Sequence, residues 1–340
     1  MSTIDEPVAQ PAEAAKPRAF AASELVQCNA CSRPNPPNRS SCLYCGTALE
    51  IKALNAFPAT PLAAADANSE TRFHVVACAP SEVEEDALDG IAESLKMKPA
   101  ELEMLLGAAS GAPIFAATSE QQARFAAAKL QEQDVSTQII SDGQLALDSS
   151  PQGILGLEID GETIGGIARR GQKPVWSSWT DVMLIVVGRL YFATREIEQK
   201  RNRGKQLIGE REMLTDEAVL DIYPRHDAHG WRIRAGSFDF SCLGENRQLT
   251  AFANFATLTG LLRERSTTAL IDDSYLRLRA ALNSVWPVEP QAHAKERRRT
   301  ALAEFDASVE SFDNERQFTR YSRLLRYLHV SKSGDHAAKT

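Results

Sequence analysis

The sequence predicts a multidomain α+β protein of 340 residues. Three observations support this fold class. Two Cys-x-x-Cys pairs lie close together near the N-terminus, strand and helix patterns alternate over residues 72–142, and a strand-rich stretch is followed by helical patterns up to residue 330. The chain contains 43% hydrophobic residues, as an ordinary globular protein does, and its length allows two or three domains.

Charge and hydropathy exclude some classes of function. The net charge of −7 argues against a general nucleic-acid-binding protein, which is usually basic. Residues 1–24 are rich in Ala, Pro and Glu, lack the apolar segment of a signal peptide and are predicted to be a disordered lead. The longest apolar run, Val182–Phe192, is shorter than the roughly 20 residues of a membrane-spanning helix. We therefore expect a cytoplasmic protein without a transmembrane segment.

The two cysteine pairs predict a structural Zn²⁺ site. Cys28 and Cys31 form the first pair and, ten residues later, Cys42 and Cys45 form the second. Four thiolates complete the tetrahedral shell of zinc and leave no position for a catalytic water, so we predict metal ligands and no catalytic residue here. A disulfide framework would require an oxidising compartment, and a rubredoxin-like iron site would require a longer spacing between the pairs.

With Gly46 and Leu49 after the second pair, residues 25–50 resemble the short bacterial zinc-ribbon domain. Two positions depart from that family: Ser32 stands where it usually has Gly, and Ser41 where it usually has an aromatic residue. A segment of this length buries too little surface to fold alone. Metal binding would therefore supply its folding free energy. Residues 51–71 lack periodicity and are predicted to be a linker.

Residues 72–142 predict a small β-α-α-β-α-β module. Ser81 and Glu84 match a capping box at the start of the first helix, and Ser119 is the expected cap of the third. The apolar spacing of the helices predicts one buried face each. The expected strands are Phe73–Ala79, Ala112–Thr118 and Val135–Ile140, and the short second helix is Pro99–Leu106.

This module resembles the C-terminal domain of the bacterial ribosomal stalk protein. The Ala-rich third helix and the strand that begins at Asp134 and Val135 carry the resemblance. The Gly- and Lys-rich segment by which that family contacts translation factors is absent. Residues 73–142 also contain four basic and twelve acidic residues, a net charge of −8. We therefore do not expect translation-factor binding.

Residues 151–265 predict a strand-rich domain closed by one amphipathic helix, from about Glu245 to Arg265. Pro224–Gly230 is expected to be a hairpin loop. The segment with Trp176, Trp179, Asp181 and Val182, followed by Gly188, resembles a strand pair of bacterial pleckstrin-homology-like domains, which implies a barrel plugged by the helix. Another small barrel or a sheet-plus-helix domain is the alternative. The expected strands are Gly153–Gly161, Thr163–Arg169, Pro174–Trp179, Asp181–Val187, Arg189–Arg195, Val219–Tyr223 and Trp231–Phe240.

Residues 266–330 predict a helical tail, and residues 331–340 a disordered end. The expected helices are Thr268–Trp286, which Pro287 ends, Ala292–Val309 and Glu315–Leu328.

Three polar groups have a functional and a plain interpretation. The hairpin-loop residues His226, Asp227 and His229 suit either a metal site or a polar turn. The basic loop Lys200, Arg201, Arg203 and Lys205 suits either an anionic membrane surface or solvent. Lys295–Arg299, on a predicted helix, would touch nucleic acid or simply be solvated.

The function that we predict is a non-enzymatic protein-interaction or regulatory adaptor of the bacterial cytoplasm. Its zinc ribbon would present Tyr44 and the surrounding loop to a protein partner. One alternative is a nucleic-acid-associated protein that uses the ribbon and Lys295–Arg299. Another is an enzyme whose site lies in the strand-rich domain; a deep pocket lined by titratable groups would favour it, and a filled interior would count against it.

Overall fold

The computed structural model describes residues 25–35, 42–45, 47, 72–202, 205–227, 229–288, 290–300 and 303–337. Within them, only the backbone is described at position 26 and at residues 195–202, 205–212, 291–300, 303–309 and 333–337. The chain divides into two units, residues 1–64 and 65–340, which are described separately below. The predicted lead (1–24) and linker (51–71) lie outside the described residues.

The first part of the larger unit has the element order β-α-α-β-α-β that the sequence leads us to expect. Its three strands form an antiparallel sheet of order β4-β3-β5. Ser119 caps α3 as expected, since its hydroxyl accepts a hydrogen bond from the Gln122 N–H. The elements are β3 (Phe73–Ala77), α1 (Glu85–Leu95), α2 (Pro99–Leu106), β4 (Ala112–Ala117), α3 (Glu120–Gln131) and β5 (Thr137–Ser141).

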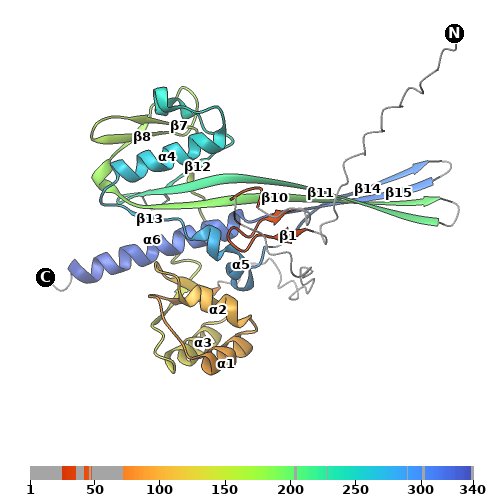
Figure 1. The fold of residues 1–340 in the computed structure, drawn as a ribbon, viewed down its shortest axis with the longest axis horizontal. Helices are drawn as coiled ribbons and strands as arrows, with labels where there is room; N and C mark the ends of the chain where they lie inside the picture. Colours follow the sequence, from red (N-terminus) through yellow and green to blue (C-terminus); the bar gives the residue numbers. More distant parts are fainter. Residues whose placement is uncertain are drawn as a thin grey trace, which may run out of the picture. The chain divides into compact units, whose positions relative to one another are not determined.

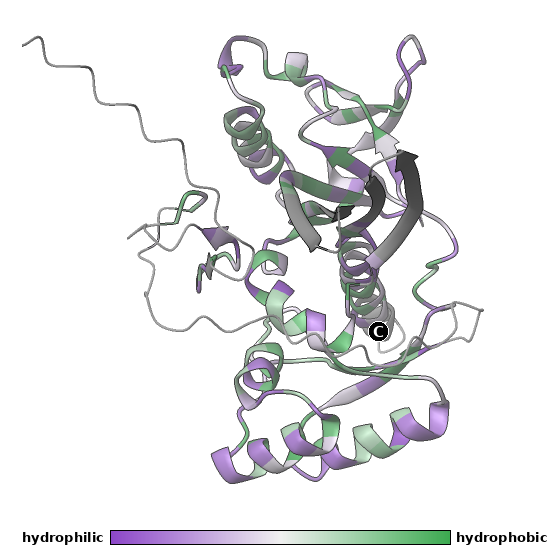
Figure 2. Cartoon of the chain, turned by 90° about the vertical axis from the view of Figure 1, so that its right-hand side faces the viewer, coloured by the Kyte–Doolittle hydropathy of each residue, from purple (hydrophilic) through white to green (hydrophobic). Residues whose placement is uncertain are grey.

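The capping box predicted for α1 is wrong. The helix begins one turn later than expected, with Glu84 at its N-cap and no side-chain cap. The Ser81 hydroxyl instead donates to the carbonyl oxygen of Ala79. Polar and apolar residues nevertheless alternate around the helices, as Figure 2 shows by hydropathy, and each helix buries one face.

A long antiparallel ribbon of β10 (Val182–Asn202) and β11 (Lys205–Pro224) dominates the rest of the unit (Figure 1). The strands predicted at Asp181–Val187 and Arg189–Arg195 are one strand, β10. It belongs to a sheet of order β14-β15-β10-β11-β12-β6, to which β13 adds as a parallel partner of β10. The shorter strands are β6 (Gln152–Ile154), β12 (Trp231–Arg234) and β13 (Leu270–Asp272).

The predicted pleckstrin-like barrel is wrong, because the strand-rich region forms two open sheets in the part of the chain that the structure describes. The second sheet has the order β7-β8-β9 and ends in the 3-10 turn η2 (Trp179–Asp181). Helix α4 (Ala251–Arg265) covers a core with Ile164, Trp231 and Leu258. The strands of the second sheet are β7 (Gly156–Ile159), β8 (Thr163–Ile167) and β9 (Val175–Ser178).

The helix predicted over Ala292–Val309 is a β-hairpin, β14 (Pro290–Thr300) and β15 (Ala303–Asp313). Strand β15 pairs with the outer half of β10, so a long-range partner overrides the helix propensity of this segment. The first predicted tail helix begins later, as α5 (Tyr275–Val285), because β13 precedes it. The last helix, α6 (Glu315–Ala337), continues through residues 331–337, which the sequence predicted to be disordered.

On one edge of β10, a single amide side chain fills the gap between the two partner strands, β13 and β15. Asn314 is fully buried between the end of β15 and the start of α6. Its Oδ1 accepts from the N–H of Tyr191 at 2.8 Å, and its Nδ2 donates to the carbonyl oxygen of Arg189 at 3.0 Å. The Asn314 amide thus takes the place of a paired strand where the parallel β13 has ended and the antiparallel β15 has not begun.

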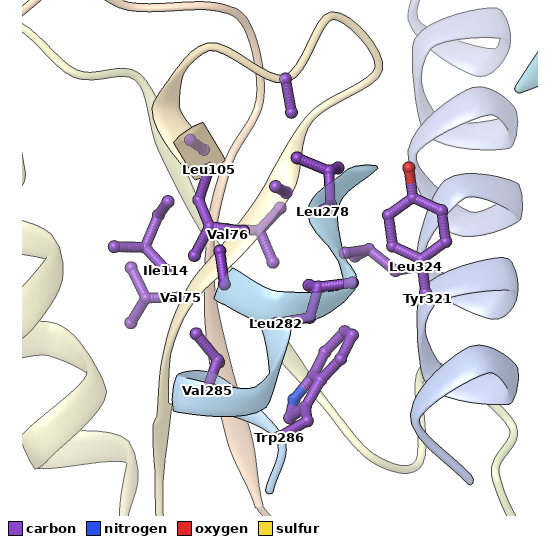
Figure 3. Packing of buried hydrophobic residues seen from close by; sticks show 14 of the residues in the cluster. Val75, Val76, Leu105, Ile114, Leu278, Leu282, Val285, Trp286, Tyr321 and Leu324 are labelled. Atoms are coloured by element: carbon purple, nitrogen blue, oxygen red, sulfur yellow. The ribbon is translucent and has the colours of Figure 1, made fainter. Parts of the chain in front are cut away.

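Helix α5 packs between the β3–β4 sheet and α6 (Figure 3). Leu278, Leu282 and Trp286 contribute to one continuous apolar core that residues 72–142 share with α5 and α6. Val75, Val76 and Ile114 approach it from the sheet, and Tyr321 and Leu324 from α6.

Buried polar groups join the same elements. The Trp286 indole Nε1–H donates to His74 Nδ1 at 3.1 Å, and His74 Nε2 lies 2.7 Å from Asp142 Oδ1. Because an indole N–H only donates, His74 Nδ1 must accept, which assigns the proton to Nε2 and makes Asp142 its acceptor. Asp272 is also buried and accepts from the hydroxyls of Ser110 and Tyr321.

Gly188 is required by close packing. A Cβ at this position of β10 would lie 2.7 Å from Cδ2 of Phe318 and 3.0 Å from Cδ1 of Tyr275. We predict that Gly188→Ala lowers the free energy of unfolding by about 1–3 kcal/mol through overpacking. Gly90→Ala in α1 is the control: its Cβ would meet nothing within 4 Å, and it should gain about 0.5–1 kcal/mol. Urea unfolding monitored by circular dichroism would measure both, and an equal effect at the two sites would contradict the prediction.

Candidate metal centre

The structure brings all four predicted cysteines together. Their Sγ atoms lie within 4.8 Å of one another. Cys28 and Cys45 approach to 3.5 Å and Cys31 and Cys42 to 3.4 Å. Four sulfurs around tetrahedral zinc, each at about 2.3 Å, would be about 3.8 Å apart, so the cluster is compatible with a single ion. Cys28, Cys31 and Cys42 are buried, and Cys45 is exposed.

A two-stranded ribbon and a left-handed turn position the first pair. Strand β1 (Val26–Gln27) pairs with β2 (Pro34–Asn35), and the Cys28 N–H donates to the carbonyl oxygen of Arg33. Ser32 has φ +54°, the conformation that favours glycine. The serine that departs from the zinc-ribbon pattern therefore adopts the backbone that the family's glycine would adopt. Gly46, Leu49 and Ser41 lie outside the described residues.

Asn35 connects the two cysteine pairs, a role that the sequence analysis missed. It is fully buried. Its Oδ1 accepts from the Leu43 N–H at 2.8 Å, while its Nδ2 is 2.8 Å from the Arg33 carbonyl oxygen and 3.4 Å from Cys42 Sγ. Its neighbours Pro34 and Pro36 are residues typical of turns, and they give no sign of a supporting role for the amide between them. A side chain that binds both a thiolate and a backbone group acts as an outer-shell support of a metal ligand.

The surroundings shift the pKa values of the four thiols in opposite directions. Burial raises the pKa of Cys28 and of Cys31 above the ordinary thiol range. Burial also acts to raise the pKa of Cys42, but the backbone N–H groups of Tyr44 and Cys45 and the Asn35 amide outweigh it and lower that pKa to about 6. Burial acts to raise the pKa of Cys45 too, but hydrogen bonds with Thr47 help to outweigh it, and that pKa is lowered. Because zinc binds thiolates, loading would displace the protons of Cys28 and Cys31, whose pKa is raised.

We predict that Asn35→Asp weakens zinc binding by about 10–100-fold, the usual cost of losing an outer-shell partner. The new carboxylate would replace a donor to Cys42 Sγ with a second negative charge. Asn29→Asp is the matched control, since Asn29 is exposed in the first turn. Competition with a chromophoric chelator would measure both affinities. Equal affinities in the two variants would show that Asn35 does not support the ligands.

The other sequence candidates do not form a metal site. The cysteine cluster is the one set of three or more His, Cys, Asp or Glu ligand atoms close enough for an ion in the described part of the chain, so the metal interpretation of the hairpin loop fails. The Asp227 carboxylate instead accepts from the His229 N–H at 2.8 Å, as in a polar turn.

The two basic groups lie on strands. Lys200 and Arg201 are near the end of β10, Lys205 begins β11, and Arg203 lies outside the described residues. Lys295–Arg299 belongs to β14 and not to the predicted helix. None of the described helices is both long and apolar enough to cross a bilayer.

Searches against family models, curated proteins and solved structures found no match to this chain. The geometry of the molecule itself therefore carries the functional argument.

Proposed function

We propose that the protein is a non-enzymatic adaptor whose N-terminal unit is a structural zinc ribbon that contacts a protein partner. The cluster of four cysteine sulfurs within 4.8 Å carries this proposal. Four thiolates fill the coordination shell of zinc, so the ion would hold the fold and activate no water. Zinc in place of disulfides also fits a reducing compartment such as the cytoplasm.

The turn that carries the second cysteine pair supports a protein contact. Leu43 is 51% exposed and Tyr44 is 38% exposed, although they stand between two of the cysteine ligands, Cys42 and Cys45. The Arg33 guanidinium lies 4.2 Å from the centroid of the Tyr44 ring and helps to hold it. An exposed aromatic residue next to an apolar one on a rigid turn is typical of the anchor residues of protein interfaces.

Charge favours a protein partner over nucleic acid. Zinc with four thiolates carries a formal charge of −2. Arg33 is the one basic side chain of the described N-terminal residues, and Arg39 lies outside them. A surface that binds phosphates normally has a surplus of positive charge. Recruitment to an anionic membrane through Lys200, Arg201, Arg203 and Lys205 is a variant of the proposal, and flotation with and without anionic lipid would test it.

A pull-down from native lysate that compares the wild type with three variants tests the adaptor function. Metal analysis first establishes whether the wild type holds one zinc per chain. Cys42→Ser/Cys45→Ser removes the ligands, Leu43→Ala/Tyr44→Ala removes the exposed pair with the cysteines intact, and Phe125→Ala removes an exposed aromatic residue of α3 as control. The proposal expects the same partner to be lost from the first two variants and kept by the control. Absence of zinc, or a partner kept by all three, would overturn it.

A further inference from the structure

A pocket of about 460 Å³ lies beside β9 in the larger unit. Strand β9 contributes one wall, the turn η2 contributes Asp181, and the β11–β12 loop contributes His226 and Asp227 from the other side. The pocket therefore unites two motifs that are about 50 residues apart in the sequence, the Trp-rich segment and the hairpin loop. Its volume is that of a small-molecule or side-chain site.

The pairing of the long strands fixes the two sides together. Val182, directly after Asp181, is the register partner of Pro224 on β11. The Arg225 N–H then donates to the carbonyl oxygen of Asp181 at 2.7 Å, which ties the loop to η2. Asp227 is held by its bond from the His229 N–H. The strand register and the Arg225–Asp181 backbone hydrogen bond thus hold the two sides of the pocket together.

Two tryptophans give the pocket an aromatic lining. Trp231 is buried at the start of β12, whereas Trp176 on β9 is 48% exposed. Gly165 is the cross-strand partner of Trp176, and a Cβ on it would lie 3.0 Å from the indole ring. Glycine at this position therefore lets the Trp176 ring lie flat against β8. A large indole held in place but left half in solvent is available to a ligand.

The charge of the lining selects the ligand. Two acidic residues, Asp181 and Asp227, line the pocket, and His226 is the one basic residue among the described residues that line it. Arg225 lies next to the lining residues on the exposed loop, and Arg326 of α6 interacts electrostatically with Asp227. Carboxylates beside an indole face attract organic cations, through charge and through cation–π contact.

We propose that this pocket binds an organic cation, either a guanidinium or an alkylated ammonium group. The cationic head would face Asp181 and Asp227, and its apolar part would contact Trp176. A metal ion is not the expected ligand, since the described carboxylates and His226 form no group close enough to hold one. The cation would come from a free small molecule or from an arginine or methylated lysine side chain. This site is independent of the zinc unit, so either proposal can fail alone.

Tryptophan fluorescence and NMR titrations of the full chain test the pocket. The free probes are choline and agmatine, and the side-chain probes are capped arginine amide and capped trimethyllysine amide. The neutral isostere 3,3-dimethylbutanol reports what shape alone contributes. We expect at least one cation to bind at least tenfold more tightly than the isostere. Tighter binding of the capped amino acids would identify a peptide ligand, and tighter binding of the free probes a small molecule.

Variants locate the binding. Trp176→Ala, Asp181→Asn and Asp227→Asn should each weaken the best probe at least tenfold. Asp86→Asn on the exposed face of α1 is the matched control and should leave the affinity unchanged. Because Trp176 is half exposed and the two Asn variants are isosteric, thermal unfolding should show that all three remain folded. No cation binding up to millimolar concentration, equal binding of the isostere, or binding that survives all three variants would overturn the proposal.

Discussion

Removing the proposed zinc from the chain is expected to unfold the N-terminal unit and leave residues 65–340 folded. Structural zinc in segments of this size contributes about 10–16 kcal/mol at neutral pH, more than the rest of so small a segment can supply. The buried groups of its described part are largely the ligands themselves, with Arg33 and Asn35. The chain divides into two compact units, so we expect that unfolding of one need not unfold the other.

Two-dimensional NMR with a strong chelator would show this directly. Amide signals of residues 25–47 should collapse to random-coil positions and return on addition of zinc, while those of the larger unit stay in place. Cys42→Ser should reproduce the chelated spectrum. Cys242→Ser, a thiol outside the cluster, should retain zinc. If the signals of the N-terminal unit persist without metal, the zinc does not determine its fold.

Substitution of Arg232 is expected to give the largest loss of stability in the larger unit. Arg232 and Asp221 are opposite each other on β12 and β11, and their side chains are 5% and 0% exposed. The guanidinium donates to both carboxylate oxygens at 2.8 Å and also reaches Thr319 and Glu315 of α6. Removing the cation leaves a buried, unpaired carboxylate, which costs about 3–5 kcal/mol.

Arg232→Met should therefore lower the melting temperature by about 6–20 °C, at roughly 2–4 °C per kcal/mol for a domain of this size. The double variant Arg232→Met/Asp221→Leu should recover much of the loss, because no buried charge remains. Lys98→Ala breaks an ion pair whose lysine is 74% exposed and should change stability by less than about 0.5 kcal/mol. A double variant no more stable than the single one would show that packing, and not the buried charge, dominates.

The parts of the molecule that sequence reasoning predicted correctly are those with local signals. Ser119 caps α3 through its own hydroxyl, and the two Cys-x-x-Cys pairs bring their sulfurs together because each turn is short. In residues 72–142 the order of strands and helices follows from apolar periodicity alone. Zinc itself, its partner and the finer domain boundaries stay predictions.

The errors occur where distant partners decide the structure. The charged segment of β14 and β15 matches a helix by composition, but β10 offers an open edge with which β15 pairs. The prediction of a closed barrel is wrong because β10 continues past Gly188 and does not turn back to close a sheet. Asn35 and the pocket beside Trp176 were missed for the same reason, since their roles depend on groups 7 to about 50 residues away.

Asn314 gives the long ribbon a boundary. Inward of it, β10 is held by β11 on one side and by β13 on the other, and it is covered by α5 and α6. Outward of it, β10 is paired with β11 on one side and with β15 on the other. Since the amide satisfies the Arg189 carbonyl and the Tyr191 N–H of β10, separation of β15 from the far end of β10 would leave these two backbone groups paired. One side chain thus marks the place where we expect fraying of β15 from β10 to stop.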